Sequence, residues 1–126
     1  MVEEFQTSRP IYMQIMDKIH LQIARNELKP GEKLPSVREM AVKAGVNPNT
    51  IQRTYSELER MKMVETKRGQ GTFVTENREM IIHLKQRLQM DIIESFVNSM
   101  KELGFTNTEM ISGLQQYIDL SQGEEN

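Results

Sequence analysis

Polar side chains that could read the edges of DNA bases cluster in one short stretch of the chain. Asn49, Thr50, Gln52 and Arg53 lie within five consecutive positions. Arginine suits the O6 and N7 atoms of guanine, whereas asparagine and glutamine suit the N6 and N7 atoms of adenine. The same side chains could simply be solvated residues on a helix surface, so their meaning depends on the elements that position them.

Two helices joined by a tight turn are predicted around this stretch. A capping box, Ser36-Val37-Arg38-Glu39, opens a short helix after Pro35, and Gly45 is placed to end it. Asn47 as an N-cap and Pro48 at the first helical position then begin a second helix. The apolar stripe predicted to be buried on this second helix consists of Ile51, Tyr55, Leu58 and Met61. Two helices around a turn that contains glycine form a helix-turn-helix, whose second helix enters the major groove.

A basic hairpin is predicted directly after the second helix. Residues 64–74 contain two short β-prone pieces around a turn with two glycines. Lys67 and Arg68 at its tip could enter the minor groove or bind phosphate, because narrow grooves attract arginine. Arg38 is a further candidate for a phosphate or base contact, although it could instead form a surface ion pair with Glu39. The complete set of predicted DNA-contacting residues is Ser36, Arg38, Asn47, Asn49, Thr50, Gln52, Arg53, Lys67, Arg68, Gly69 and Gln70.

Charge is distributed unevenly along the 126 residues, which have a formal net charge of -2. Residues 1–75 contain twelve basic and nine acidic side chains, whereas residues 76–126 contain four basic and nine acidic ones. A basic half followed by an acidic half indicates that only the first half meets a polyanion.

The second half of the chain is predicted to form two helices that associate with a second copy. A broad apolar stripe follows Arg78, Gly104 ends that helix, and the capping box Thr106-Asn107-Thr108-Glu109 begins another. So small a unit cannot enclose a substantial pocket, and nothing in a monomer would cover the stripe. We therefore predict a homodimer that uses Ile81, Leu84, Leu88, Ile92, Phe96, Met110, Leu114 and Tyr117.

The predicted fold class is mainly α (α+β), with an N-terminal winged helix-turn-helix and a two-helix C-terminal dimerisation extension. A first helix is expected from Ser8-Arg9-Pro10 to Lys29-Pro30-Gly31. The domain boundaries are placed at 1–76 for the DNA-binding domain, 77–121 for the dimerisation tail and 122–126 for a frayed end.

The composition disfavours an enzyme. The chain has no cysteine and only two histidines, His20 and His83, which leaves little material for nucleophilic, acid–base or metal chemistry. Both histidines are expected on helix surfaces, and we predict neither a metal site nor a cofactor. No apolar run exceeds three residues, so no membrane span is expected. The expected location is the cytoplasm, in association with the nucleoid.

The ordered motifs resemble the DNA-binding domain of GntR-family bacterial transcription regulators. The opening Pro10-Ile11-Tyr12 and the short helical tail are similar to the YtrA-like branch of that family. The resemblance implies a homodimer that binds a palindromic operator and represses a transporter-type operon. It also implies DNA contacts by Arg38, Asn49, Thr50, Arg53 and Gly69. The motifs that carry it are Leu34-Pro35-Ser36-Val37-Arg38-Glu39-Met40-Ala41, Gly45-Val46-Asn47-Pro48-Asn49-Thr50 and Gly69-Gln70-Gly71-Thr72-Phe73-Val74.

One alternative from another functional class is a protein-interaction module whose winged helix does not bind DNA. No residue pattern indicates a small-molecule effector. If an effector binds, we expect it in the dimer, between the DNA-binding domain and the tail.

Overall fold

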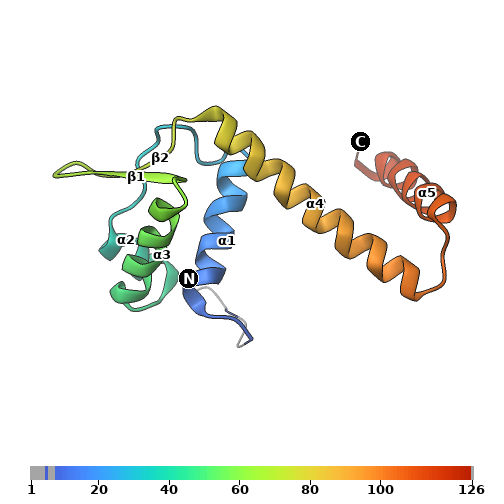
Figure 1. Cartoon of the computed structure of the whole chain (residues 1–126), viewed down its shortest axis with the longest axis horizontal. Coiled ribbons are helices and arrows are strands. Elements are labelled where there is room, and N and C mark those ends of the chain that lie inside the picture. Colours follow the sequence, from blue (N-terminus) through green and yellow to red (C-terminus); the bar gives the residue numbers. More distant parts are fainter. Residues whose placement is uncertain (1–4, 6–7, 126) are drawn as a thin grey trace. The chain divides into compact units, whose positions relative to one another are not determined.

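The computed structural model describes residue 5 and residues 8–125. The chain divides into two compact units, residues 1–85 (unit 1) and residues 86–126 (unit 2), and the fourth helix begins in the first and ends in the second (Figure 1). The elements in chain order are α1 (Ile11–Ala24), α2 (Val37–Ala44), α3 (Pro48–Arg60), β1 (Val64–Lys67), β2 (Gly71–Val74), α4 (Arg78–Glu102) and α5 (Asn107–Glu125). This is the predicted order of elements.

Helix α1 ends earlier than the sequence indicated. It stops at Ala24, whereas we expected it to continue to the Lys29-Pro30-Gly31 segment. The backbone turns at Asn26, whose φ of 64° lies in the left-handed region that asparagine tolerates better than most residues. The N–H groups of Glu27 and Leu28 then donate to the carbonyl oxygen of Gln22 at 2.8 and 3.0 Å. These two bonds satisfy a carbonyl that the end of the helix would otherwise leave without a partner.

His20 is in the core, so the prediction of a surface position is wrong. Its side chain is 5% exposed. Ile15, Ile19 and Ile23 define the buried face of α1, and His20 lies directly beside Ile19 at the edge of that face. His83 on α4 is exposed, as predicted.

Helices α2 and α3 begin as predicted, through local capping interactions. The hydroxyl of Ser36 accepts a hydrogen bond from the N–H of Glu39 at 3.1 Å, and the Glu39 carboxylate accepts from the N–H of Ser36 at 2.9 Å. Gly45 ends α2 with a φ of 71°. The side-chain carbonyl oxygen of Asn47 accepts from the N–H of Asn49 at 2.8 Å, and a proline occupies the first position of α3. The turn between the two helices is therefore only three residues long.

The Glu39 carboxylate makes the α2 cap dependent on pH. Hydrogen bonds from the backbone and side chain of Ser36 hold the pKa of the Glu39 carboxyl below its usual value. Because the pKa is lower in the folded state, this stabilisation is present above about pH 4.3 and is lost as the pH falls through the lowered value.

We expect the stability difference between wild type and Glu39→Gln to shrink on acidification. Glutamine keeps the capping oxygen but does not titrate. The measurement is the free energy of unfolding in urea for both proteins between pH 7 and pH 3. A difference that stays constant over this range would contradict the assignment.

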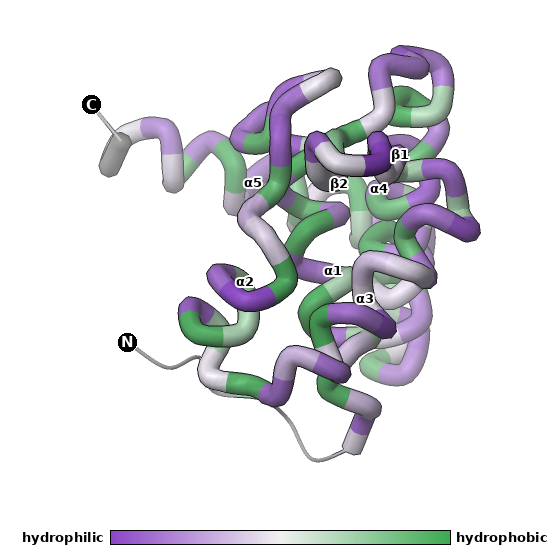
Figure 2. Tube along the Cα trace, turned by 90° about the vertical axis from the view of Figure 1, so that its left-hand side faces the viewer, coloured by the Kyte–Doolittle hydropathy of each residue, from purple (hydrophilic) through white to green (hydrophobic). Residues whose placement is uncertain are grey.

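The core of unit 1 lies between α1, α2, α3 and the hairpin. Hydrophobic and hydrophilic stretches alternate along α2 and α3, as expected for helices with one buried face (Figure 2). The Tyr55 hydroxyl donates to the Pro35 carbonyl at 2.7 Å, which ties α3 to the entrance of α2, and burial raises the pKa of Tyr55 to about 12. The buried residues of α2, α3 and the hairpin are Ala41, Ala44, Ile51, Thr54, Tyr55, Leu58, Val64 and Val74.

The hairpin is an antiparallel pair in the predicted position. Val64 is opposite Val74 at its base, and Lys67 is opposite Gly71 near its tip. The segment 31–34, which leads into α2, also pairs with β2. The N–H of Leu34 donates to the Thr72 carbonyl, and the N–H of Val74 donates to the Glu32 carbonyl, both at 2.8 Å. The hairpin is thereby attached to the segment that precedes the helix-turn-helix.

Unit 2 consists of the later part of α4 together with α5. The predicted capping box opens α5: the N–H of Thr106 donates to the Glu109 carboxylate at 2.9 Å, and the N–H of Glu109 donates to the Thr106 hydroxyl at 3.2 Å. Helix α5 continues to Glu125, past residue 121, after which we expected fraying. Within the described residues, no helix has the length and apolar character that a membrane crossing requires.

Candidate nucleic-acid interface

The predicted base-reading residues lie along the first two turns of α3. Asn49, Gln52 and Arg53 are exposed, whereas Ile51 between them is fully buried. Thr50 is half-buried, and its carbonyl oxygen accepts a hydrogen bond from the Thr54 hydroxyl at 2.9 Å. Three of the four side chains are therefore free of the core and have the donors and acceptors that base edges require.

Ser36 and Asn47 both act as helix caps, and Asn47 keeps hydrogen-bond donors for another partner. The Ser36 hydroxyl and the side-chain carbonyl oxygen of Asn47 are acceptors in the caps. The Ser36 side chain also hydrogen-bonds the Glu39 carboxylate, whereas the asparagine keeps both N–H groups as donors. The capping role of Asn47 is therefore compatible with a phosphate contact.

Arg38 is exposed near the start of α2 and does not form the ion pair considered as an alternative. The Glu39 carboxylate binds the backbone of Ser36 instead. In the part of the chain that the structure describes, Arg38 is not among the residues in ion pairs, which involve Arg9, Arg25 and Arg60. Its guanidinium therefore remains available for an anion such as a DNA phosphate.

Arg53 has a partner that sequence reasoning missed. Its guanidinium carbon lies 3.9 Å from the centroid of the Tyr12 ring, which belongs to α1. In the sequence, Tyr12 stands out only as part of the opening Pro10-Ile11-Tyr12, which assigns it no contact with the recognition helix. The two residues are 41 positions apart, and no local pattern connects them.

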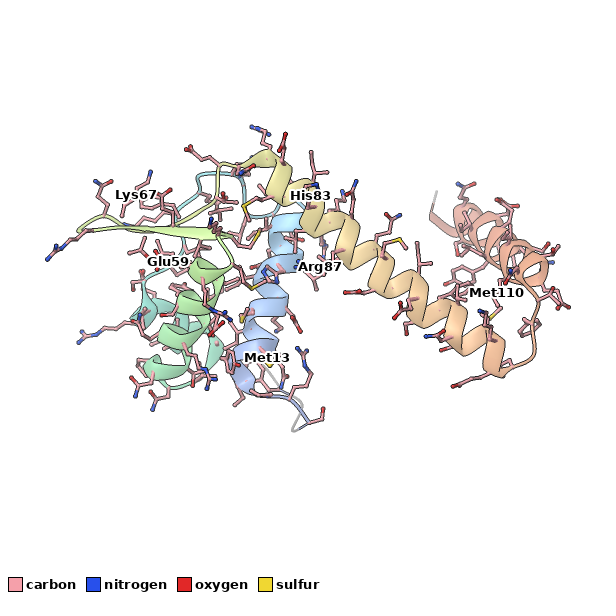
Figure 3. The ribbon with its side chains drawn as sticks, in the orientation of Figure 1. Met13, Glu59, Lys67, His83, Arg87 and Met110 are labelled. Atoms are coloured by element: carbon pink, nitrogen blue, oxygen red, sulfur yellow. The ribbon has the colours of Figure 1, made fainter. Side chains whose placement is uncertain are left out.

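The hairpin tip presents basic and polar groups to solvent. Lys67, Arg68, Gly69 and Gln70 are all exposed. The Lys67 ammonium lies 4.9 Å from the centroid of the Phe73 ring on the neighbouring strand, which restrains a side chain that would otherwise be mobile. Figure 3 shows Lys67 on the extended hairpin and Glu59 near its base. The hairpin is a basic wing beside the helix-turn-helix.

Lys33 is a second residue that sequence reasoning did not single out. The segment that contains it bridges to Phe73, and its side chain lies over Gly71. A Cβ atom added at Gly71 would lie 2.7 Å from Cε of Lys33, and Gly71 has a φ of 125°. Glycine is favoured here by the backbone conformation, whereas the flexible end of the lysine side chain could move aside for a Cβ atom. The bridge could not be predicted because no hairpin pattern connects residues 31–34 with β2.

Glu59 fixes the wing relative to α3. Its carboxylate accepts a hydrogen bond from the N–H of Thr66 in β1 at 3.0 Å. Together with the bonds from segment 31–34, this contact holds the wing to both helices of the helix-turn-helix. Unit 1 therefore presents a recognition helix and a basic wing from one connected scaffold. A wing next to a helix of this kind suits simultaneous contact with bases and phosphates.

Three helices followed by this hairpin define a winged helix-turn-helix protein of the DNA-binding class. Residues 11–74 match the family described as "Bacterial regulatory proteins, gntR family". The chain belongs to this family, which makes it a transcription regulator rather than an enzyme.

Two curated relatives from Bacillus subtilis (strain 168) are similar over most of the chain. The first, "Uncharacterized HTH-type transcriptional regulator YhcF", is 55% identical over 94% of this chain and 98% of its own length. The second, "HTH-type transcriptional repressor YtrA", is 40% identical over 71% of this chain and 73% of its own length. The resemblance to the YtrA-like branch is therefore confirmed.

Solved structures show the same fold. A GntR family transcriptional regulator from Listeria monocytogenes has a TM-score of 0.83 and 39% identity over 89% of this chain and 98% of its own. The DNA-binding domain of AraR, in a complex with operator ORX1, has a TM-score of 0.55 and 28% identity over 59% of this chain and 96% of its own. The predicted mainly α fold, a winged helix-turn-helix followed by two C-terminal helices, is confirmed.

Proposed function

We propose that the protein is a homodimeric repressor that binds a palindromic operator and controls a transporter-type operon, acting in the cytoplasm on DNA of the nucleoid. The observation that carries the DNA-binding part is the recognition helix α3, which displays Asn49, Gln52 and Arg53 beside a basic wing. The repressor role is supported by the similarity to YtrA, which is named a repressor.

Exposed apolar side chains in unit 2 support the homodimer. A single surface apolar residue is ordinary, but a concentration of them marks an interaction site. Those of unit 2 that are more than two-fifths exposed are Met90, Ile92, Ile93, Leu103, Phe105, Ile111, Leu114, Tyr117, Ile118 and Leu120. Some of them line an apolar groove together with Phe96 and Val97. A second copy that presents the same surface would cover these side chains in an isologous contact.

Two of the predicted dimer residues do not offer surface to a partner. Leu84 is 2% exposed and Met110 is 4% exposed within the single chain. Helical periodicity correctly identifies the apolar face of each helix. It does not show whether that face is covered by the same chain or by a second copy. The proposed interface therefore excludes Leu84 and Met110. It keeps the six partly or largely exposed residues Ile81, Leu88, Ile92, Phe96, Leu114 and Tyr117.

Specificity also favours two recognition helices. Each good bidentate base contact discriminates by about 1–3 kcal/mol, and α3 presents three exposed candidates. Specific regulators exceed their own nonspecific binding by about 4–10 kcal/mol. One unit reaches this range only if every contact is good. Two copies of unit 1, spaced by about one turn of the duplex, make twice as many base contacts, so they reach this range even when some contacts are weak.

The test begins with duplexes that the wild-type protein selects from a randomised library. We expect the selected sequences to be palindromic. Arg53→Ala should weaken binding to the selected duplex by about 1–3 kcal/mol and relax the preference at one base position in each half-site. Lys67→Ala should weaken binding to selected and random duplexes alike, because phosphate contacts carry no sequence information.

Two results would contradict the proposal. If Arg53→Ala lowered affinity equally for selected and random DNA, its base-reading role would be wrong. If the wild-type chain bound no duplex at all, the winged helix would instead be a protein-interaction module. Affinities are measured by fluorescence anisotropy at one fixed salt concentration.

A further inference from the structure

Tyr12 and Arg53 form the contact that joins α1 to the outer surface of the recognition helix. The guanidinium carbon of Arg53 lies 3.9 Å from the centre of the Tyr12 ring, which is a stacking distance. Arg53 is exposed, whereas Tyr12 is half-buried. The ring therefore belongs to the fixed scaffold, and the exposed arginine lies over it.

The backbone under the Tyr12 ring is held against α3. The Thr54 hydroxyl, which is fully buried, lies 3.4 Å from the Tyr12 carbonyl and 2.9 Å from the Thr50 carbonyl. Helix α1 packs directly on α3 along this line. The labelled Met13 in Figure 3 marks this end of α1. Tyr12 is thus carried by a rigid part of unit 1.

The other arginine on the outer side of α3 is engaged elsewhere. Arg60 donates from Nε to the Glu57 carboxylate at 3.1 Å, one turn back along the helix. The ion pair with Glu57 raises the pKa of Arg60 above its ordinary value. Arg60 carries the same charge on the same helix but binds Glu57, and the Tyr12 hydroxyl makes only the smallest contribution to its raised pKa, so Arg60 is a control for charge on α3.

We infer that Tyr12 is a positioning residue for base readout, because its ring holds the Arg53 guanidinium in one orientation before DNA binds. This inference rests on the proposed function. A guanidinium that stacks by its face keeps its N–H groups, which lie in the plane, free to bind a base edge. An arginine loses rotamer freedom when it binds, and a side chain already restrained by a ring loses less. Specificity at the Arg53 base position then depends on a residue outside the helix-turn-helix.

The experiment combines variants of both residues on the duplex selected by the wild-type protein. Tyr12→Leu is expected to weaken binding about two- to five-fold, the range that cation–π contacts at exposed sites give. It should also partly relax the base preference at the position where Arg53→Ala relaxes it. In the Arg53→Ala background, Tyr12→Leu should have no further effect. Tyr12→Phe keeps the ring and should bind like wild type, and Arg60→Ala should leave the base preference unchanged.

A second measurement needs no DNA. In the free protein, the Tyr12 ring should shift the Arg53 δ-methylene proton resonances upfield, in wild type and in Tyr12→Phe alike. Should Tyr12→Leu fail to fold, this ring-current shift still tests the contact in the wild-type protein and in Tyr12→Phe.

The outcomes separate this inference from the proposed function. Failure of the wild-type protein to select any duplex would overturn the proposed function and the inference with it. Selection followed by equal losses from Tyr12→Leu in the wild-type and Arg53→Ala backgrounds would overturn only the positioning role. An absent ring-current shift in the wild-type protein would overturn it as well.

Discussion

A chain in which Ile92 and Tyr117 are both replaced by aspartate is expected to be monomeric and to bind a palindromic duplex about 100-fold or more weakly. These side chains are 67% and 70% exposed in the single chain, so the substitutions remove little of its own packing. A charge in the centre of an apolar interface would remain unpaired and lose its hydration. Once the dimer is lost, the second half-site no longer binds intramolecularly, and that avidity contributes about 10²- to 10⁴-fold.

Light scattering after size exclusion gives the mass, and anisotropy gives the affinity for the full palindrome and for a single half-site. The half-site affinity should stay unchanged, since unit 1 is untouched. Leu21→Asp is a matched control, because Leu21 is an exposed apolar residue of α1 in unit 1. It should leave the mass at that of a dimer. A variant that remains dimeric, or a monomer that binds the palindrome as tightly as wild type, would disprove this assignment of the interface.

Features decided by neighbouring residues could be predicted from the sequence. The two capping boxes, at Ser36 and at Thr106, each involve residues only three positions apart. The turn at Gly45 and the order of helices and hairpin follow from equally local signals. The Ser36 capping box and the Gly45 turn define the helix-turn-helix, and the Thr106 box defines the start of α5, which explains why the fold and the recognition helix could be derived without the structure.

Features decided by tertiary contacts could not be predicted. Pattern alone does not reveal that His20 packs inside, that the Tyr12 ring lies against Arg53, or that Lys33 passes over Gly71. The end of α1 was missed for a different reason. A proline and a glycine at 30–31 are stronger sequence signals than Asn26, but the backbone turned at the earlier residue.

The affinity for DNA is expected to fall about 1,000-fold between 50 and 200 mM salt. Arg38, Lys67 and Arg68 are the exposed candidates for phosphate contacts in each chain, so a dimer would make about six such contacts. Each neutralised phosphate contributes about −0.9 to the slope of log K against log[salt], because counterions are released from the duplex. A much shallower dependence would show that these side chains are not at the phosphates.

The salt dependence of a variant with one wing residue replaced shows how many protein chains bind the duplex. Lys67→Ala removes one contact from a monomer but two from a dimer, so the slope should change by about 1 in the first case and about 2 in the second. Lys101→Ala, in the last turn of α4, removes the same charge outside the proposed interface and should leave the slope unchanged.

The chain carries a net charge of -2, so net attraction to DNA cannot produce a steep slope. A steep slope that responds to Lys67 and not to Lys101 therefore requires a local basic surface on unit 1. An unchanged slope in Lys67→Ala would remove the wing from the DNA interface.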